Sequence, residues 1–132
     1  MRNKPTITAD DAHKMMAACK AEAAKNNWKV AIAITDDAGA LWLLERVEGA
    51  GRITAAVALG KARTAAMMDR PSKMAEERAK QRPGFLNFPD ILPIQGGLPI
   101  IVQGECIGAI GVSGVQSHED EQVAKAGIDA LG

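Results

Sequence analysis

The sequence predicts an α+β fold, in which helices flank a mainly antiparallel sheet, as a single domain over residues 1–132. Stretches typical of β-hairpins alternate along the chain with stretches typical of amphipathic helices, and this order favours an antiparallel sheet covered by helices. Of the 132 residues 47% are hydrophobic and 24% are charged, which is ordinary for a globular domain with a real core. No repeat or low-complexity tract divides the chain.

The first helix is predicted from a start signal, an apolar stripe and a stop. Thr8 and Asp11 fit the capping box that opens a helix. An apolar stripe then runs down to about Lys25, and Asn26-Asn27 ends the helix. The stripe consists of Ala12, Met16, Cys19 and Ala23.

A hairpin and a second helix are expected next. The apolar runs Lys29–Thr35 and Ala40–Arg46 are separated by the turn residues Asp-Asp-Ala-Gly, so we expect two paired strands. After the glycines near position 50, an alanine-rich helix runs from Arg52 to about Met68.

The next segment predicts a short helix and then irregular structure. Pro71 ends the preceding helix, and Ser72 is expected to cap a charged helix over 73–81. Residues 82–97 contain three prolines and three glycines, which predicts an irregular covering segment.

Two apolar runs, Leu98–Val102 and Cys106–Val112, form the centre of the predicted sheet. Between them we place Gly104 and Glu105 at the central positions of a type II′ turn. The second run is apolar on both faces, which predicts a strand that is covered on both sides. Its glycines leave room for close neighbours, on one face at 108 and 114 and on the other at 111. Ser117 is then expected to cap a last helix that runs through Leu131.

Composition and missing motifs exclude several classes of function. Basic and acidic residues balance at 16 each, so no net charge attracts nucleic acid or an anionic membrane. No apolar run approaches the length of a membrane span, and no signal core follows the first residues. The two cysteines lie far apart in apolar surroundings, which favours free thiols in a cytoplasmic protein. Dinucleotide-binding, P-loop and nucleophile-elbow motifs are absent.

His13 is the most interesting candidate ligand. His13 and His118 each lie in the first turn of a predicted helix, where a lone histidine is usually exposed or part of a cap. His13, however, borders the apolar stripe, with Met16 at i+3. A neutral imidazole at such an edge can ligate the iron of a porphyrin.

A second candidate site is a polar cluster after the second strand. Arg46 and Glu48 lie there, and Lys61 follows on the next helix. Arginine matches a carboxylate in a bidentate way, so the cluster is a candidate site for a small carboxylate, although the pattern is more typical of the alternative that follows. A salt network at a subunit interface is the alternative interpretation.

Several short motifs together resemble the GlcG/HbpS-like family. Asp37-Ala38-Gly39 followed by Arg46 and Glu48-Gly49-Ala50 is similar to the D-x-G…R-x-D-G-A run of that family, with Glu48 in place of the usual aspartate. The other matching motifs are Lys61–Ala65 (K-A-x-T-A), Gly96–Ile100 (G-G-x-P-I), Gly108–Gly114, and Asp120 with Ala126-Gly127 in the last helix. Gln116 departs from the family where a glycine is common.

The resemblance implies a profilin-like fold with a five-stranded sheet, and assembly into homo-oligomers from dimers to octamers. Such an assembly would place the small residues of the alanine-rich helix at close subunit contacts. Family members bind haem or corrinoid, and one branch is the C-terminal domain of PduO-type cobalamin adenosyltransferases. Other members are encoded among catabolic enzymes.

Two main hypotheses of function follow. The first is a small-molecule-binding domain for haem or a related tetrapyrrole, with His13 as iron ligand. Its candidate residues are His13, Met16, Phe85 and Gly97, and Met15, Met67 and Met68 are alternative soft ligands, although methionine stripes are more often core.

The second is a cofactor-independent lyase or isomerase that acts on a small carboxylate or aromatic substrate, with Arg46 or Lys61 as anchor, Glu48 as general base and Phe85 and Phe88 as cover. A scaffold role of the oligomer itself is the third.

Overall fold

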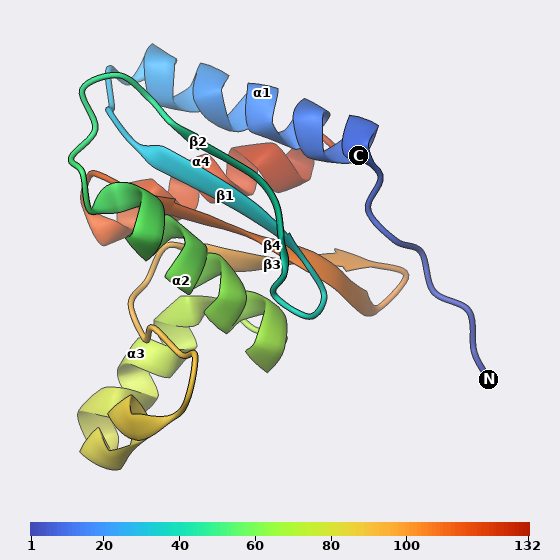
Figure 1. The fold of residues 1–132 in the computed structure, drawn as a ribbon, viewed down its shortest axis with the longest axis vertical. Coiled ribbons are helices and arrows are strands. Elements are labelled where there is room, and N and C mark those ends of the chain that lie inside the picture. Colours follow the sequence, from blue (N-terminus) through green and yellow to red (C-terminus); the bar gives the residue numbers. More distant parts are fainter.

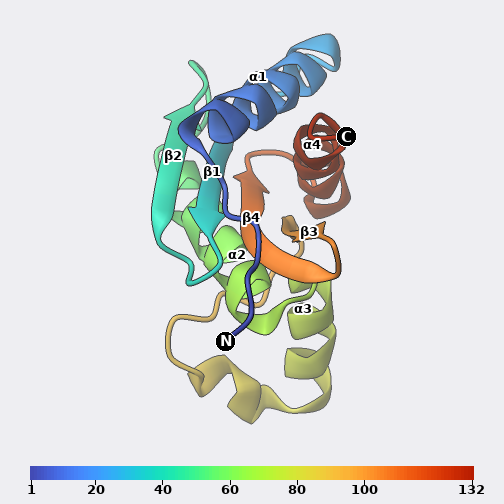
Figure 2. The same cartoon turned by 90° about the vertical axis from the view of Figure 1, so that its right-hand side faces the viewer.

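The computed structural model describes all 132 residues and consists of one four-stranded sheet between two layers of helices (Figures 1 and 2). The strands lie in the order β2-β1-β4-β3, and every neighbouring pair is antiparallel. Helices α1 and α4 cover one face, α2 covers the other, and α3 with a short 3-10 helix, η1, projects beyond the end of α2. The elements are α1 (Ala9–Lys25), β1 (Ala31–Asp36), β2 (Leu41–Arg46), α2 (Thr54–Met68), α3 (Ser72–Gln81), η1 (Pro83–Asn87), β3 (Gly97–Val102), β4 (Glu105–Ser113) and α4 (Ser117–Asp129).

The α+β class, the helices and the antiparallel sheet are confirmed. The expectation of five strands is wrong, because the two hairpins supply four strands and no other segment pairs with them. The profilin-like classification stays a prediction. None of the helices combines the length and the apolar character that crossing a bilayer requires.

The two faces of the sheet are packed in different ways. The face under α1 and α4 carries large side chains, among them Ile32, Ile34, Ile110 and Val112, all fully buried. Between α2 and the other face lie seven buried alanines, three on the strands and four on the helix, which let the helix backbone approach the strands closely. Gly111 completes this contact, because a Cβ atom there would overlap the Ala58 carbonyl oxygen. The alanine-rich face of α2 is therefore used inside the chain, and its assignment to subunit contacts is wrong.

The turn between β3 and β4 differs from the predicted one. Val102 pairs with Glu105, so the two central residues are Gln103 and Gly104, and both have positive φ, 53° and 75°. Two positive φ values are the pattern of a type I′ turn, whose twist suits a hairpin. A bulge between Ile100 and Ile101 shifts the register of the same hairpin by one residue.

One helix cap is as predicted and two are not. Thr8 and Asp11 form the full capping box of α1. The cap of α3 is Pro71, because the Ser72 hydroxyl bonds across to the segment before β3. The cap of α4 is Gln116, one residue before the predicted Ser117. Both cysteines are free, with Cys19 buried and Cys106 only half-buried.

Candidate functional site

A groove with a volume of about 280 Å³ lies between α1 and the edge strand β2. Helix α1 presents His13 and Met16 to it at i and i+3, and β2 contributes Leu43 and Leu44. The groove is apolar at its centre and charged at one end, where Lys20 Nζ lies 2.9 Å from the Glu45 carboxylate across the two elements. Its lining residues are His13, Met16, Ala17, Lys20, Leu43, Leu44 and Glu45.

The imidazole of His13 is oriented by its own helix. Its Nδ1 atom lies 2.8 Å from the carbonyl oxygen of Ala9, one turn earlier. A carbonyl oxygen can only accept, so Nδ1 must carry the proton and donate it. In the neutral imidazole the Nε2 atom then keeps its lone pair, and the side chain of His13 is exposed in the groove. A backbone carbonyl that fixes the tautomer in this way is typical of histidines that ligate metals.

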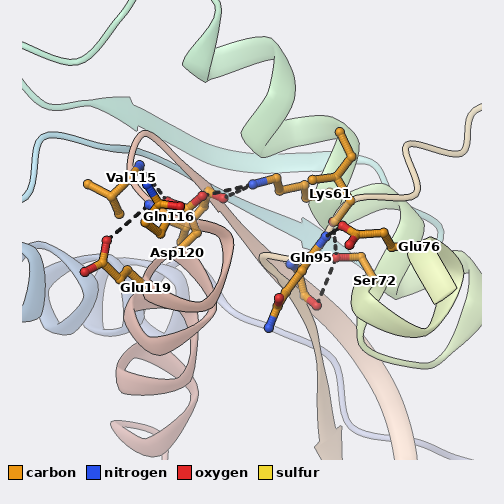
Figure 3. A network of polar contacts seen from close by, with 11 residues as sticks. Lys61, Ser72, Glu76, Gln95, Val115, Gln116, Glu119 and Asp120 are labelled. Atoms are coloured by element: carbon orange, nitrogen blue, oxygen red, sulfur yellow. Dashed lines mark hydrogen bonds and ion pairs between the residues drawn. The ribbon is translucent and has the colours of Figure 1, made fainter.

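Lys61 lies elsewhere, in a buried ion pair between two helices (Figure 3). Its Nζ atom is 3.1 Å from Asp120 Oδ2 and 3.0 Å from the Val112 carbonyl oxygen. The side chains are only 3% and 2% exposed. Burial raises the pKa of the Asp120 carboxyl, and the nearby Lys61 ammonium opposes that rise. The pair joins α2 to α4, which cover opposite faces of the sheet.

Gly97 belongs to the same buried region and not to the groove of His13. Its N–H donates to the Ser72 hydroxyl at 2.8 Å, and that hydroxyl donates to the Ile94 carbonyl at 2.7 Å. A Cβ atom at position 97 would overlap the Lys61 carbonyl oxygen. The backbone of Gln95 is held in turn by the carboxylate of Glu76 at 3.0 Å (Figure 3). These bonds fix the segment that leads into β3, which is a structural role for Gly97.

The predicted carboxylate clamp is not brought together. Arg46, the last residue of β2, and Glu48, just beyond it, are both exposed, and no ion pair or hydrogen bond joins either of them to Lys61. The ammonium of Lys61 is already bound to Asp120 and is buried away from solvent. A catalytic role for Arg46 and Glu48 stays a prediction. Lys61, the third residue of the predicted cluster, does not join them.

Phe85 lies in a second groove, of about 490 Å³, between α3 and η1. Its ring is paired with that of Phe88, with centroids 4.6 Å apart. The groove shares no residue with that of His13, so the four predicted haem contacts are divided among three places. The lining residues are Arg78, Gln81, Arg82, Gly84, Phe85 and Phe88.

Two features of these sites were not predicted from the sequence. Lys61 lies on the same buried helix face as Ala58, Ala62 and Ala65, and a lysine on a buried face requires a buried acid. The position of Lys61 on a buried face predicts an acidic partner, but it does not indicate that this partner is Asp120. The β2 wall of the His13 groove is formed by residues that had been predicted only as strand.

Comparison with known proteins identifies close relatives over nearly the whole chain. The family model described as "Haem degrading protein HbpS-like" matches residues 7–129. Protein GlcG of Escherichia coli strain K12 is 41% identical over 114 residues, which cover 86% of this chain and 85% of that protein. The crystal structure of a double mutant of HbpS from Streptomyces reticuli matches with a TM-score of 0.93 at 32% identity, and covers 100% of this chain and 91% of that one. A crystal structure of a PduOC:haem complex has a TM-score of 0.88 at 21% identity, over 96% of this chain and 95% of that one, which shows a shared fold.

Proposed function

This chain belongs to the HbpS-like family, and we propose that it binds haem or a related tetrapyrrole in the groove between α1 and β2. The observation that carries the proposal is the hydrogen bond of 2.8 Å between His13 Nδ1 and the Ala9 carbonyl oxygen. It leaves the Nε2 lone pair free for iron at the rim of an apolar groove. The family description, which names haem, and the haem complex of PduOC on the same fold support this choice of ligand.

The residues of the groove fit the parts of such a ligand. Imidazole nitrogen is a common axial ligand of haem iron. Leu43 and the side of Met16, which pack in the same core cluster, offer apolar surface to a flat macrocycle. The Lys20 ammonium, which is half-exposed at the charged end, is suited to a carboxylate at the ligand's edge. When bound, the haem would supply the redox and gas-binding chemistry of its iron, and the chain supplies the axial nitrogen, the apolar wall and a cation.

We further propose that the chain acts as a homo-oligomer, in the range from dimers to octamers, in the cytoplasm. A groove of about 280 Å³ lies just below the usual range for ligand sites, about 300–1,000 Å³, so we propose that a second subunit encloses the exposed side of a tetrapyrrole. Leu41 and Trp42, which are 48% and 45% exposed on the edge strand β2, supply apolar surface beside it. The two free thiols are consistent with a reducing compartment.

A haem titration of the purified apoprotein, followed by absorbance and by elution from a sizing column, tests the proposal. We expect a saturable Soret band that co-elutes with the protein at a fixed stoichiometry. His13→Ala should remove the absorbance of the iron–imidazole complex. His118→Ala is the matched control, because His118 is an exposed histidine in the first turn of α4, and it should leave the spectrum unchanged. Non-saturating binding, or equal spectra for His13→Ala and the wild type, would refute the assignment.

A further inference from the structure

We propose that the groove between α3 and η1 is a second ligand site, which takes an anionic aromatic molecule of the aromatic carboxylate class. This site is separate from the groove of His13 and does not depend on tetrapyrrole binding. The inference comes from two arginines and two aromatic rings that line one cavity.

Local backbone bonds place these four side chains on consecutive turns. The Arg82 N–H donates to the Arg78 carbonyl at 2.8 Å, and the Phe85 N–H donates to the Arg82 carbonyl at 2.9 Å. The Phe88 N–H then donates to the Phe85 carbonyl at 3.3 Å. Pro83, at the start of η1, fixes one backbone angle in this run. These backbone hydrogen bonds therefore hold the two arginines and the two phenylalanines in defined positions along a short segment.

The charge in this groove is one-sided. Arg78 and Arg82 both line it, and no acidic residue is among its six lining residues. Neither arginine takes part in an ion pair, although Glu76 pairs with Lys80 on the same helix. An unpaired guanidinium offers a planar set of donors that matches a carboxylate in a bidentate way. Two such groups in one cavity favour an anion.

The two phenylalanine rings indicate that the rest of the ligand is flat and apolar. Phe85 and Phe88 lie with centroids 4.6 Å apart and planes tilted by 35°. Phe88 is 53% exposed, so a flat apolar ligand that stacks on it would remove water from its surface. A volume of about 490 Å³ is within the usual range for small-molecule sites. A small inorganic anion would leave the rings uncovered.

A tetrapyrrole also combines flat rings with carboxylates, but this groove lacks an iron ligand. Histidine, methionine and cysteine are absent from its lining residues. The groove also lies on the part of the molecule that projects away from the sheet (Figures 1 and 2). An occupant of this groove would thus leave the His13 groove open.

Isothermal titration calorimetry with 1-naphthoate as probe tests the proposal. We expect saturable binding of one probe per chain, and much weaker binding of 1-naphthalenemethanol, which has the same rings without the charge. Arg78→Gln and Arg82→Gln should each weaken naphthoate binding by about tenfold or more, because each removes a charge-assisted hydrogen bond. Arg52→Gln, an exposed arginine outside the groove, is the matched control and should bind as the wild type does.

Two further variants distinguish this site from the His13 groove and from a contact between two copies of the chain. Phe88→Ala should weaken the naphthoate and the neutral analogue alike, and His13→Ala should leave both unchanged. Equal losses for Arg52→Gln and Arg78→Gln, or loss of naphthoate binding in His13→Ala, would overturn the proposal. It would also be overturned if the probe failed to bind; if Phe88→Ala then eluted as a smaller species, a second copy of the chain would be the occupant of the groove.

Discussion

Replacing Lys61 by methionine tests the buried ion pair between α2 and α4. Methionine keeps most of the apolar stem of lysine and removes the ammonium, which leaves the Asp120 carboxylate, 2% exposed, without its cation. Breaking a buried pair in this way typically costs about 3–5 kcal/mol. Since domains of this size unfold with about 5–15 kcal/mol, we expect Lys61→Met to fold but to be much less stable than the wild type at pH 7.

The loss of stability should shrink as the pH falls. Burial raises the pKa of the Asp120 carboxyl, and the Lys61 ammonium acts against that rise, so its removal raises the pKa further. A carboxyl whose pKa is higher in the folded state than in the unfolded state favours folding below the unfolded pKa. That contribution is lost as the pH rises through the folded pKa. The difference between the variant and the wild type should therefore narrow as the pH falls, by at most about 1.4 kcal/mol per pH unit.

Urea denaturation followed by circular dichroism at pH 5, 6 and 7 measures both effects. Lys125→Met is the matched control, because Lys125 pairs with Asp129 at 2.8 Å on the surface of α4, with side chains 69% and 61% exposed. That pair should be worth less than about 1 kcal/mol. A cost for Lys61→Met no larger than that of Lys125→Met at pH 7, or one that is the same at all three pH values, would refute this role of the pair.

Four further predictions concern the packing, the segment before β3 and the thiols. Gly111→Ala should destabilise the fold by several kcal/mol or prevent folding, since its Cβ would overlap the backbone of α2, whereas Gly84→Ala, which faces open space, should fold normally by circular dichroism. Ser72→Ala should cost about 1–3 kcal/mol in urea denaturation, because it leaves a buried N–H and a carbonyl without their partner; a loss below about 0.5 kcal/mol would contradict the role given to this hydroxyl. Iodoacetamide should modify Cys106 before Cys19, as shown by mass spectrometry, because Cys106 is only half-buried, whereas Cys19 is fully buried and burial raises the pKa of its thiol to about 12. The raised pKa also means that the neutral Cys19 thiol stabilises the fold below about pH 9, and that this stabilisation is lost as the pH rises toward 12. Cys19→Ala should therefore lose less stability at alkaline pH than the wild type does.

Local signals were sufficient to predict most of the elements. Periodicity and turn residues located four helices and two hairpins, and the capping box of Thr8 fixed the start of α1. The turn between β3 and β4 was misplaced by one residue, because a bulge at Ile100 and Ile101 changes the register and is not visible in a pattern of period two. Ser72 and Ser117 were assigned as caps from residue type alone, and Ser72 instead serves a tertiary contact.

The candidate sites were less accessible to sequence reasoning. His13 and Met16 were paired correctly because i and i+3 share a helix face, whereas the opposite wall of their groove depends on how β2 packs beside α1. Lys61 was grouped with Arg46 from nearness along the chain, but the rotation of α2 directs it to Asp120. Side-chain partners that are far apart in the sequence follow from the tertiary packing, which no local pattern encodes.

The order of strands in the sheet has a consequence for synthesis of the chain. The central pair joins β1 to β4, with Ala31 opposite Ser113, so β1 leaves the ribosome 82 residues (113 − 31) before the last of its partners. At about 5–20 residues per second this interval is roughly 4–16 s. During that time the six residues of β1, five of which are buried in the finished fold, lack the β4 strand beside them and the α4 helix above them, although α1 and α2 have already been made. Holdase chaperones that recognise apolar segments would therefore meet this nascent chain at residues 31–35, and slowing translation between the two hairpins would increase aggregation of the newly made protein.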